Sequence, residues 1–252
     1  MPVEYQSAKR GVNAQRTLRA FRYLVLSLGF VSFLPGGGRA ETVSYATSDQ
    51  VSITADYYRG EKGRGGFVLF HRSGARSEQM AALAQALVQR GFHVLTPDLR
   101  GHGRSDAEAR APRAADSSPW LRDGAAAVSY LRSLLGAEAP IGLLGIERGA
   151  EIAARTMTGS SDPRGALVLL DPSDSLTGLA ILQSTSDARR PVLIIAGRDD
   201  ARAREAARAL FLARPASQLW LLDGGARVVD RLLSRADFVD DLASWIAEAT
   251  AG

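Results

Sequence analysis

The chain has 252 residues, of which 46% are hydrophobic and 23% are charged, values typical of a globular domain rather than of a disordered or multi-span membrane protein. The formal net charge of +4 does not indicate nucleic-acid binding, because the arginines are scattered singly among acidic residues instead of forming a basic stripe. The absence of cysteine excludes disulfides, a thiolate nucleophile, a cysteine metal site and a lipoprotein anchor.

The amino terminus carries the pattern of an export signal. Basic residues precede an apolar run at 21–34, and the small residues up to Ala40 are typical of a signal-peptide cleavage site. The run is shorter than the ~20 residues that cross a bilayer as a helix. We expect residues 1–40 to be a signal peptide and residues 41–252 to be one domain, periplasmic or secreted. The alternative is an uncleaved N-terminal anchor, which is the only membrane contact that we expect.

Strand-like and helix-like stretches then alternate along the chain. This alternation predicts an α/β fold with a mostly parallel sheet flanked by helices, and continuous apolar runs such as GFVLF and ALVLL are typical of its central strands. We expect strands at 51–57, 66–71, 93–97, 141–144, 166–170, 192–196 and 218–222. We expect helices at 77–90, 118–135, 149–156, 201–213 and 234–249.

Four segments in chain order resemble signatures of the α/β-hydrolase superfamily, in particular its small bacterial esterase and dienelactone-hydrolase-like members. They are VLFHRSG at 68–74 (oxyanion loop), TPDLRGHGRSD at 96–106 (D-x-R-G-x-G-x-S loop), LLGIERGAEIAA at 143–154 (nucleophile elbow) and PVLIIAGRDD at 191–200 (strand before the triad acid). The likeness covers nearly everything from 51 to 246. It implies an α/β-hydrolase fold with a short lid between 171 and 190.

The nucleophile position departs from the family pattern. In G-x-S-x-G the serine lies on a tight strand-to-helix turn, and glycines frame it because the backbone is crowded there. In this sequence Gly145 and Gly149 are present, but Glu147 occupies the serine position. We therefore expect the turn to form with a carboxylate at its tip.

The position of the catalytic histidine is changed as well. The segment LLDGGARVVD at 221–230 matches the loop that carries this histidine in the family, and it has Arg227 there. No histidine follows His102 in the chain. Asp200, or alternatively Asp199, matches the position of the triad acid. The resemblance also predicts the residues of the oxyanion loop and cleft: His71, Arg72, Ser73, Ile146 and Arg148.

These replacements change the chemistry that the cleft allows. A guanidinium stays protonated at physiological pH, so Arg227 cannot abstract a proton. A carboxylate nucleophile has precedent in haloalkane-dehalogenase-like relatives, but without a histidine its ester intermediate would accumulate. We expect Glu147 to face Arg227, with Asp200 nearby, and to have a lowered pKa because of that charge and of the helix N-terminus. Such a pair either anchors a cationic ligand or only locks an inactive cleft.

Other candidate groups have simpler interpretations. His71 is the one histidine that we expect near the cleft, where it shapes the oxyanion loop or, alternatively, acts as a base. His93 and His102 are expected in a strand and a turn, and Ser73, Ser105 and Ser173 in loops. We assign no cofactor and no metal, since the sequence lacks histidine pairs at metal-ligand spacing. Four acids leave weak binding of a hard cation open: Asp171, Asp174, Asp199 and Asp200.

Three functions from different classes are compatible with these residues. The first is an exported homologue that binds a small molecule or a partner protein without turnover, because both reactive positions are replaced. The second is a divergent hydrolase of ester-type substrates that uses Glu147, with His71 or an activated water. The third is a scaffold that forms oligomers. Only the second requires measurable turnover.

Overall fold

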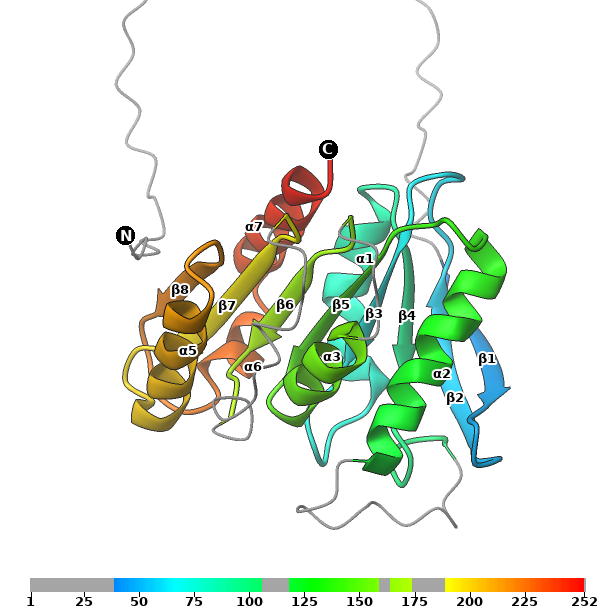
Figure 1. Ribbon diagram of the computed structural model, residues 1–252, viewed down its shortest axis with the longest axis horizontal. Coiled ribbons are helices and arrows are strands. Elements are labelled where there is room, and N and C mark those ends of the chain that lie inside the picture. Colours follow the sequence, from blue (N-terminus) through cyan, green and yellow to red (C-terminus); the bar gives the residue numbers. More distant parts are fainter. Residues whose placement is uncertain (1–38, 106–117, 159–163, 174–188, 252) are drawn as a thin grey trace, which may run out of the picture.

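The computed structural model describes residues 39–105, 118–158, 164–173 and 189–251. In these ranges eight strands form one sheet in the order β1-β2-β4-β3-β5-β6-β7-β8 (Figure 1). Strands β3 to β8 are mutually parallel, and β2 is antiparallel to both of its neighbours. The strands are β1 (Glu41–Ala46), β2 (Ser52–Tyr58), β3 (Gly66–Phe70), β4 (His93–Pro97), β5 (Ile141–Ile146), β6 (Leu167–Leu170), β7 (Val192–Gly197) and β8 (Gln218–Leu222).

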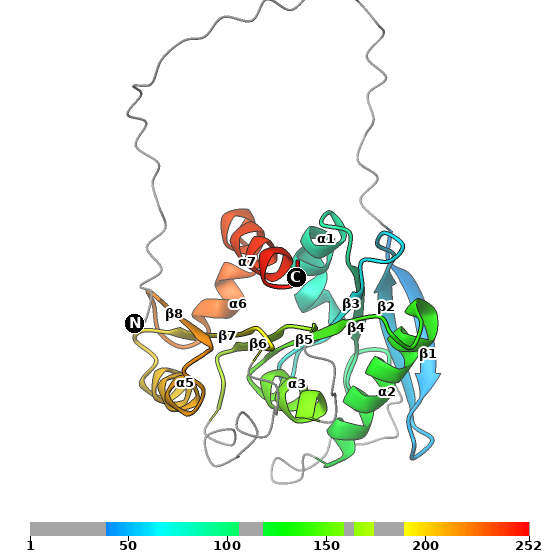
Figure 2. The same cartoon turned by 45° about the horizontal axis from the view of Figure 1, so that its top comes forward.

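Helices cover both faces of the sheet. Helices α1, α6 and α7 lie on one face and α2, α3 and α5 on the other (Figure 2). Their bounds are η1 (Ser77–Met80, a 3-10 helix), α1 (Ala81–Val88), α2 (Ser118–Leu135), α3 (Arg148–Thr158), α5 (Ala201–Ala213), α6 (Val228–Leu232) and α7 (Ala236–Ala249). None of the helices in the described ranges is long and apolar enough to cross a membrane.

Two apolar cores result from the alternation of side chains along the central strands. In β3, Val68 and Phe70 contribute to the core under α2, α3 and α5, whereas Phe67 and Leu69 contribute to the core under α1, α6 and α7. All four side chains are almost completely buried. The apolar runs of the sequence are therefore strands that are buried on both faces, as in other parallel sheets.

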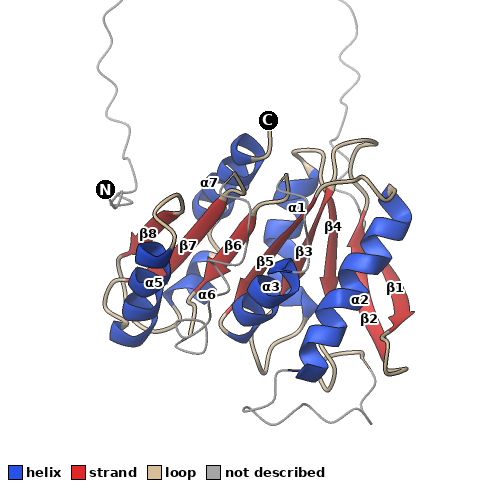
Figure 3. Cartoon of the chain, in the orientation of Figure 1, coloured by secondary structure: helices blue, strands red, loops and turns tan. Residues whose placement is uncertain are grey.

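The predicted fold class, a sheet of strands flanked by helices, is confirmed (Figure 3). Most elements also lie where the sequence places them. Two elements were not predicted, namely the edge strand β1 and the short helix α6. The predicted helix at 77–90 begins as the 3-10 helix η1 and ends at Val88. The predicted leader lies almost entirely outside the described residues, as do most of the predicted lid and the loop that follows the D-x-R-G-x-G-x-S segment.

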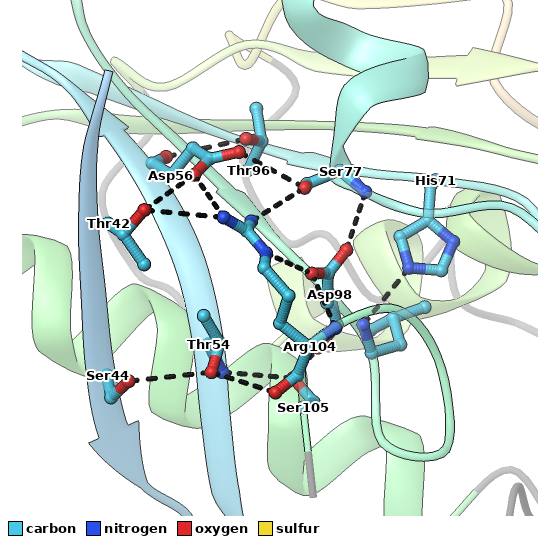
Figure 4. A network of polar contacts seen from close by, with 11 residues as sticks. Thr42, Ser44, Thr54, Asp56, His71, Ser77, Thr96, Asp98, Arg104 and Ser105 are labelled. Carbon is cyan, nitrogen blue, oxygen red and sulfur yellow. Dashed lines mark hydrogen bonds and ion pairs between the residues drawn. The ribbon is translucent and has the colours of Figure 1, made fainter. Parts of the chain in front are cut away.

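A polar network around the buried carboxylate of Asp98 explains the D-x-R-G-x-G-x-S segment (Figure 4). Asp98 is completely buried after β4, and its carboxylate accepts hydrogen bonds from the backbone N–H groups of Ser77 (2.7 Å) and Arg104 (3.0 Å). The Arg104 guanidinium pairs with Asp98 at 3.0 Å and with Asp56 of β2 at 2.8 Å. Gly103 lies so close that a Cβ atom there would be 2.3 Å from the Asp98 carboxyl carbon. The segment thus ties η1, β2 and β4 together.

Candidate functional site

A cleft of about 380 Å³ opens at the carboxyl ends of β5, β6 and β7, which is where α/β folds usually bind ligands. The loop residues Ser73 and Ser173 contribute to its wall. Six charged side chains of the described residues also line it: Glu147, Arg148, Asp171, Asp200, Arg202 and Arg227. Carboxyl and guanidinium groups are equally represented among these six, and this part of the cleft is strongly polar.

The turn between β5 and α3 places Glu147 in this cleft. Glu147 has a left-handed backbone with φ of 49°, a strained conformation for a residue other than glycine. A Cβ atom on Gly145 would lie 2.0 Å from the Gly149 carbonyl oxygen, and one on Gly149 would lie 2.4 Å from the Phe70 carbonyl oxygen. Only glycine fits at the two framing positions, and the turn forms with glutamate at its tip.

The expected lowering of the Glu147 pKa is wrong. Burial raises the pKa of this half-buried carboxyl, and the nearby Asp230 carboxylate raises it further, whereas Arg72 and Arg227 act in the opposite direction. Among the described residues no cation lies within ion-pair distance of Glu147. The desolvation of the carboxyl group therefore outweighs the attraction of the two guanidinium groups.

Arg227 and Asp200 approach the cleft from the loops after β8 and β7. Arg227 also has a left-handed backbone, with φ of 60°, and directly precedes α6. Its exposed side chain lines the cleft with Glu147, but the two do not form an ion pair. Asp200 caps α5, since its Oδ1 accepts a hydrogen bond from the Ala203 N–H at 3.0 Å. Asp199 is exposed and does not line the cleft, so Asp200 is the acid of the pair that the structure favours.

The loop after β3 is held in place by residues of η1 and α6. The Arg72 guanidinium pairs with Asp230 at 2.8 Å, and Gln79 donates to the other oxygen of the same carboxylate at 2.7 Å. Gln79 also accepts a hydrogen bond from the Arg72 backbone N–H at 3.1 Å. Arg72 thus positions the loop, while the next residue, Ser73, reaches the cleft.

His71 is not available as a base. Its ring is completely buried, its Nε2 accepts a hydrogen bond from the Leu99 backbone N–H at 3.0 Å (Figure 4), and its Nδ1 is hydrogen-bonded to the Arg72 carbonyl at 2.7 Å. The ring is therefore a neutral tautomer with the proton on Nδ1. Burial lowers the pKa of His71 to about 4. The alternative role of His71 as a catalytic base is thus disfavoured by its geometry.

The other two histidines of the chain also have both ring nitrogens engaged. His102 accepts from the Gly74 N–H and is hydrogen-bonded to the Arg100 carbonyl. His93 contacts the Tyr57 hydroxyl, the Gly60 N–H and the Glu61 carbonyl. Each has a structural role. The sequence holds three histidines, and none of them lines the cleft.

Asp171 is the cleft residue whose importance the sequence analysis missed. It follows β6 directly, is 8% exposed and has φ of 44°. Burial raises its pKa to about 7, although the Gly197 N–H donates to its Oδ1, and the carboxylates of Asp200 and Glu147 raise it further. The sequence did contain a signal for this residue, namely an acid immediately after a buried strand. Ile146 and Leu170 are register partners in β5 and β6, so the residues that follow them, Glu147 and Asp171, leave the sheet at the same end.

The remaining predicted residues, Ile146 and Arg148, differ in their relation to the cleft. Ile146 is buried beneath the elbow. Arg148 lines the cleft, but its guanidinium pairs with the buried Glu151 and lies 5.2 Å from the centre of the Trp120 ring. Within the described ranges, no three histidine, aspartate or glutamate side chains gather closely enough to hold a metal ion. Asp174 lies outside these ranges.

The comparisons with known proteins agree with this arrangement. A family model described as serine aminopeptidase, S33 matches residues 61–176. The chain has the α/β-hydrolase fold, and 116 of its 252 residues resemble this family model. An esterase from Pyrococcus furiosus superposes with a TM-score of 0.67 at 19% identity, over 85% of this chain and 93% of that chain. Among curated protein sequences, none matches this chain significantly.

Two further comparisons with solved structures cover the whole of the matched protein. A hypothetical protein from Pseudomonas aeruginosa superposes with a TM-score of 0.66 at 18% identity, over 91% of this chain and 100% of that chain. A predicted CIB-like hydrolase from Thermoplasma acidophilum gives 0.64 at 17%, over 84% and 100%. At these identities the likeness concerns the fold alone. The activity must be inferred from the cleft itself.

The raised pKa of Asp171 predicts a pH dependence of the stability of this protein. An aspartate has a pKa near 3.9 when unfolded, so between about pH 4 and 7 the folded state holds a proton that the unfolded state has lost. Stability must therefore fall as the pH rises through this window. We expect Asp171→Asn to remove much of this fall and to raise the free energy of unfolding at pH 8 by about 1–4 kcal/mol.

Urea denaturation at pH 5 and pH 8 tests this expectation. The amide oxygen that Asp171→Asn introduces can still accept the Gly197 hydrogen bond, so the comparison isolates the charge. Asp199→Asn is the matched control, because Asp199 is exposed two residues beyond the end of β7. Parallel pH dependences of parent and Asp171→Asn would contradict the assigned charge state.

Proposed function

We propose that this protein is an exported α/β-hydrolase homologue whose elbow cleft binds a small polar molecule without serine-hydrolase turnover. The observation that carries the proposal is that Glu147 at the nucleophile position and Arg227 at the histidine position both line one cleft of about 380 Å³. Export rests on the amino-terminal pattern of basic, apolar and small residues.

The chemistry of the cleft supports binding over serine-type catalysis. Serine catalysis requires a hydroxyl at the elbow and a base that accepts its proton and returns it. Here the elbow presents a carboxyl group, and the histidine position presents a guanidinium, which holds its protons. Both groups reach the cleft without a mutual ion pair, so each is available to a ligand that carries complementary charge or hydrogen-bonding groups.

A second candidate function is favoured by Asp171. A buried carboxyl group with a pKa near 7 is suited to general base catalysis. In a divergent ester hydrolase, ionised Asp171 would take a proton from water as the water oxygen attacks the ester carbonyl. It would then return that proton to the alcohol that leaves. This candidate requires turnover that depends on Asp171, whereas the binding function does not.

Hydrolysis of short-chain aryl esters by the full-length protein tests both candidates. We expect the parent, Glu147→Gln and Asp171→Asn to hydrolyse the esters at the same background rate, because under the binding function the cleft contributes no turnover. Turnover by the parent that is lost in Asp171→Asn and that rises with pH near 7 would support the divergent hydrolase and reject the binding function.

Ligand binding is then measured directly by thermal unfolding with a panel of small amines, carboxylates and zwitterions. A ligand at about 100 times its Kd stabilises the folded state by ~2.7 kcal/mol, which is readily detected as a shift in Tm. We expect the shift to be lost in Glu147→Gln/Arg227→Gln. A shift that persists in this variant would place the ligand elsewhere.

A further inference from the structure

A second and larger cavity, of about 620 Å³, lies at the opposite end of the strands from the elbow cleft. It is bounded by the loop between β2 and β3 and by the loop between α2 and β5, at the amino ends of β3, β4 and β5. The elbow cleft lies at the carboxyl ends of the parallel strands, so the two hollows are separated by the length of the sheet. None of the residues of the candidate active site contributes to this second cavity, which we call the basic cavity.

The walls of the basic cavity are fixed by close backbone packing. Gly65 has φ of 83°, and a Cβ atom there would lie 2.7 Å from the Pro140 carbonyl oxygen. A Cβ atom on Gly60 would lie 2.3 Å from the Phe92 backbone. Glycine at these positions lets the two loops approach the ends of the strands and leaves the space between them open.

A hydrogen-bonded histidine fixes the floor of the basic cavity. His93, at the start of β4, is 7% exposed, and its Nδ1 accepts from the Gly60 N–H at 3.2 Å and contacts the Tyr57 hydroxyl at 2.6 Å. Its Nε2 is hydrogen-bonded to the Glu61 carbonyl at 3.1 Å. The β2–β3 loop is thereby attached to the sheet, and the cavity is a preformed feature of the fold.

The lining combines positive charge with apolar surface. Among the described residues that line it, Arg59, Lys62 and Arg164 are cationic and Glu138 carries a carboxylate. Arg164 is held in position by a hydrogen bond from its guanidinium to the Glu138 carbonyl at 2.7 Å. The apolar part includes Leu134, whose exposed fraction of 46% is unusual for a large hydrophobic side chain. A volume of this size is within the range of small-molecule sites.

We propose that the basic cavity binds a short amphiphilic anion, an acyl carboxylate or an alkyl phosphate, with its charged head beside Arg59, Lys62 and Arg164 and its chain against Leu134 and Leu135. An inorganic anion would leave the apolar surface exposed to water, and a neutral chain would gain nothing from the excess positive charge of the lining. The site is independent of the elbow cleft and of the function proposed for it.

Isothermal titration calorimetry of the full-length protein with four probes tests this proposal. The probes are octanoate, octyl phosphate, octan-1-ol and inorganic phosphate, all kept below micelle-forming concentrations. We expect saturable binding of the two amphiphilic anions, and affinities at least about tenfold lower for octanol and for inorganic phosphate. The affinity for octyl phosphate should fall when NaCl is raised from about 20 to about 200 mM, because salt screens exposed charges.

Variants assign the site and separate it from the elbow cleft. Arg59→Glu/Arg164→Glu should lower the affinity for octyl phosphate at least about tenfold, and Arg59→Lys/Arg164→Lys should retain most of it. Arg208→Glu, an exposed charge reversal on α5, is the matched control and should have no effect. Leu134→Asp tests the apolar contact should the charge-reversal variant fail to fold. Unchanged affinity in Leu134→Asp or in the charge-reversal variant, or loss of affinity in Glu147→Gln, would overturn the proposal.

Discussion

The Glu147→Ser/Arg227→His variant is expected to hydrolyse short-chain aryl esters at least about 100-fold faster than the parent. A positioned general base alone contributes about 10²-fold to 10⁴-fold, and the variant gains both this base and the hydroxyl nucleophile that it activates. Both positions line the same cleft in the parent, and among the residues that the structure describes neither side chain has an ion-pair partner that must be displaced.

The backbone at both positions is compatible with the substitutions. The turn that holds position 147 is framed by glycines that the packing requires, so we expect it to remain. Position 227 is left-handed, with φ of 60°, a conformation that histidine adopts more readily than most residues. Asp200 and Asp171 line the same cleft, so a carboxylate is available to orient the new imidazole.

The control for this experiment is Glu147→Ala/Arg227→His, which has the base but no nucleophile. We expect its rate to stay near that of the parent, and each single variant to remain at least about tenfold slower than the double variant. Equal rates for the double variant and this control would mean that positions 147 and 227 do not meet across the cleft. The assignment of the two reactive positions would then be incorrect.

Removing the carboxylate of Asp98 is expected to be among the most destabilising single changes in the chain. Asp98→Ala leaves the N–H groups of Ser77 and Arg104 without their acceptor and removes one of the two carboxylates that pair with the Arg104 guanidinium. The Arg104 side chain is 39% exposed, but each hydrogen bond to a charged group contributes about 1.5–3 kcal/mol, and the buried Asp98 carboxylate accepts two from backbone N–H groups, so the total loss is about 3 kcal/mol or more. We expect a loss of this size in the free energy of unfolding, with little change in the elbow cleft, which lies on other strands.

Urea denaturation at pH 7 measures this loss, and Asp240→Ala is the matched control. Asp240 also pairs with an arginine, Arg90, but its side chain is 70% exposed, so its removal should cost less than about 1 kcal/mol. Burial alone would raise the pKa of Asp98, but the hydrogen bonds from Ser77 and Arg104 outweigh it and lower the pKa. The contribution of Asp98 is therefore present above about pH 4 and is lost as the pH falls further. Equal losses for the two variants would contradict the role of the network.

The sequence predicts the central part of the fold well because its strands are buried on both faces. Runs such as those of β3 and β6 are continuously apolar, and few other structures accommodate them. The edge strand β1 was missed because its residues are mostly exposed or half-buried and show no apolar run. Its position follows from antiparallel pairing with β2, from Glu41 opposite Tyr57 to Ala46 opposite Ser52, and this long-range pairing has no local signature.

The candidate site could be located from the sequence but its electrostatics could not. The elbow glycines and the order of the motifs place Glu147, Asp200 and Arg227 correctly around one cleft. The direction of the Glu147 pKa shift was predicted incorrectly because it depends on burial and on Asp230, which belongs to the unpredicted helix α6. Asp171 was overlooked as a cleft residue for a similar reason, since its pKa depends on how deeply β6 places it.

The two glycines of the elbow have a consequence for how this protein can change by mutation. Any side chain at position 145 or 149 would collide with backbone atoms of the same turn or of the neighbouring strand, so these positions admit little variation. The side chain at position 147 extends into the cleft and meets no such obstacle. Substitutions there would alter the chemistry presented to the cleft without disturbing the scaffold. Position 147 can therefore acquire side chains of different reactivity with little effect on the stability of the fold.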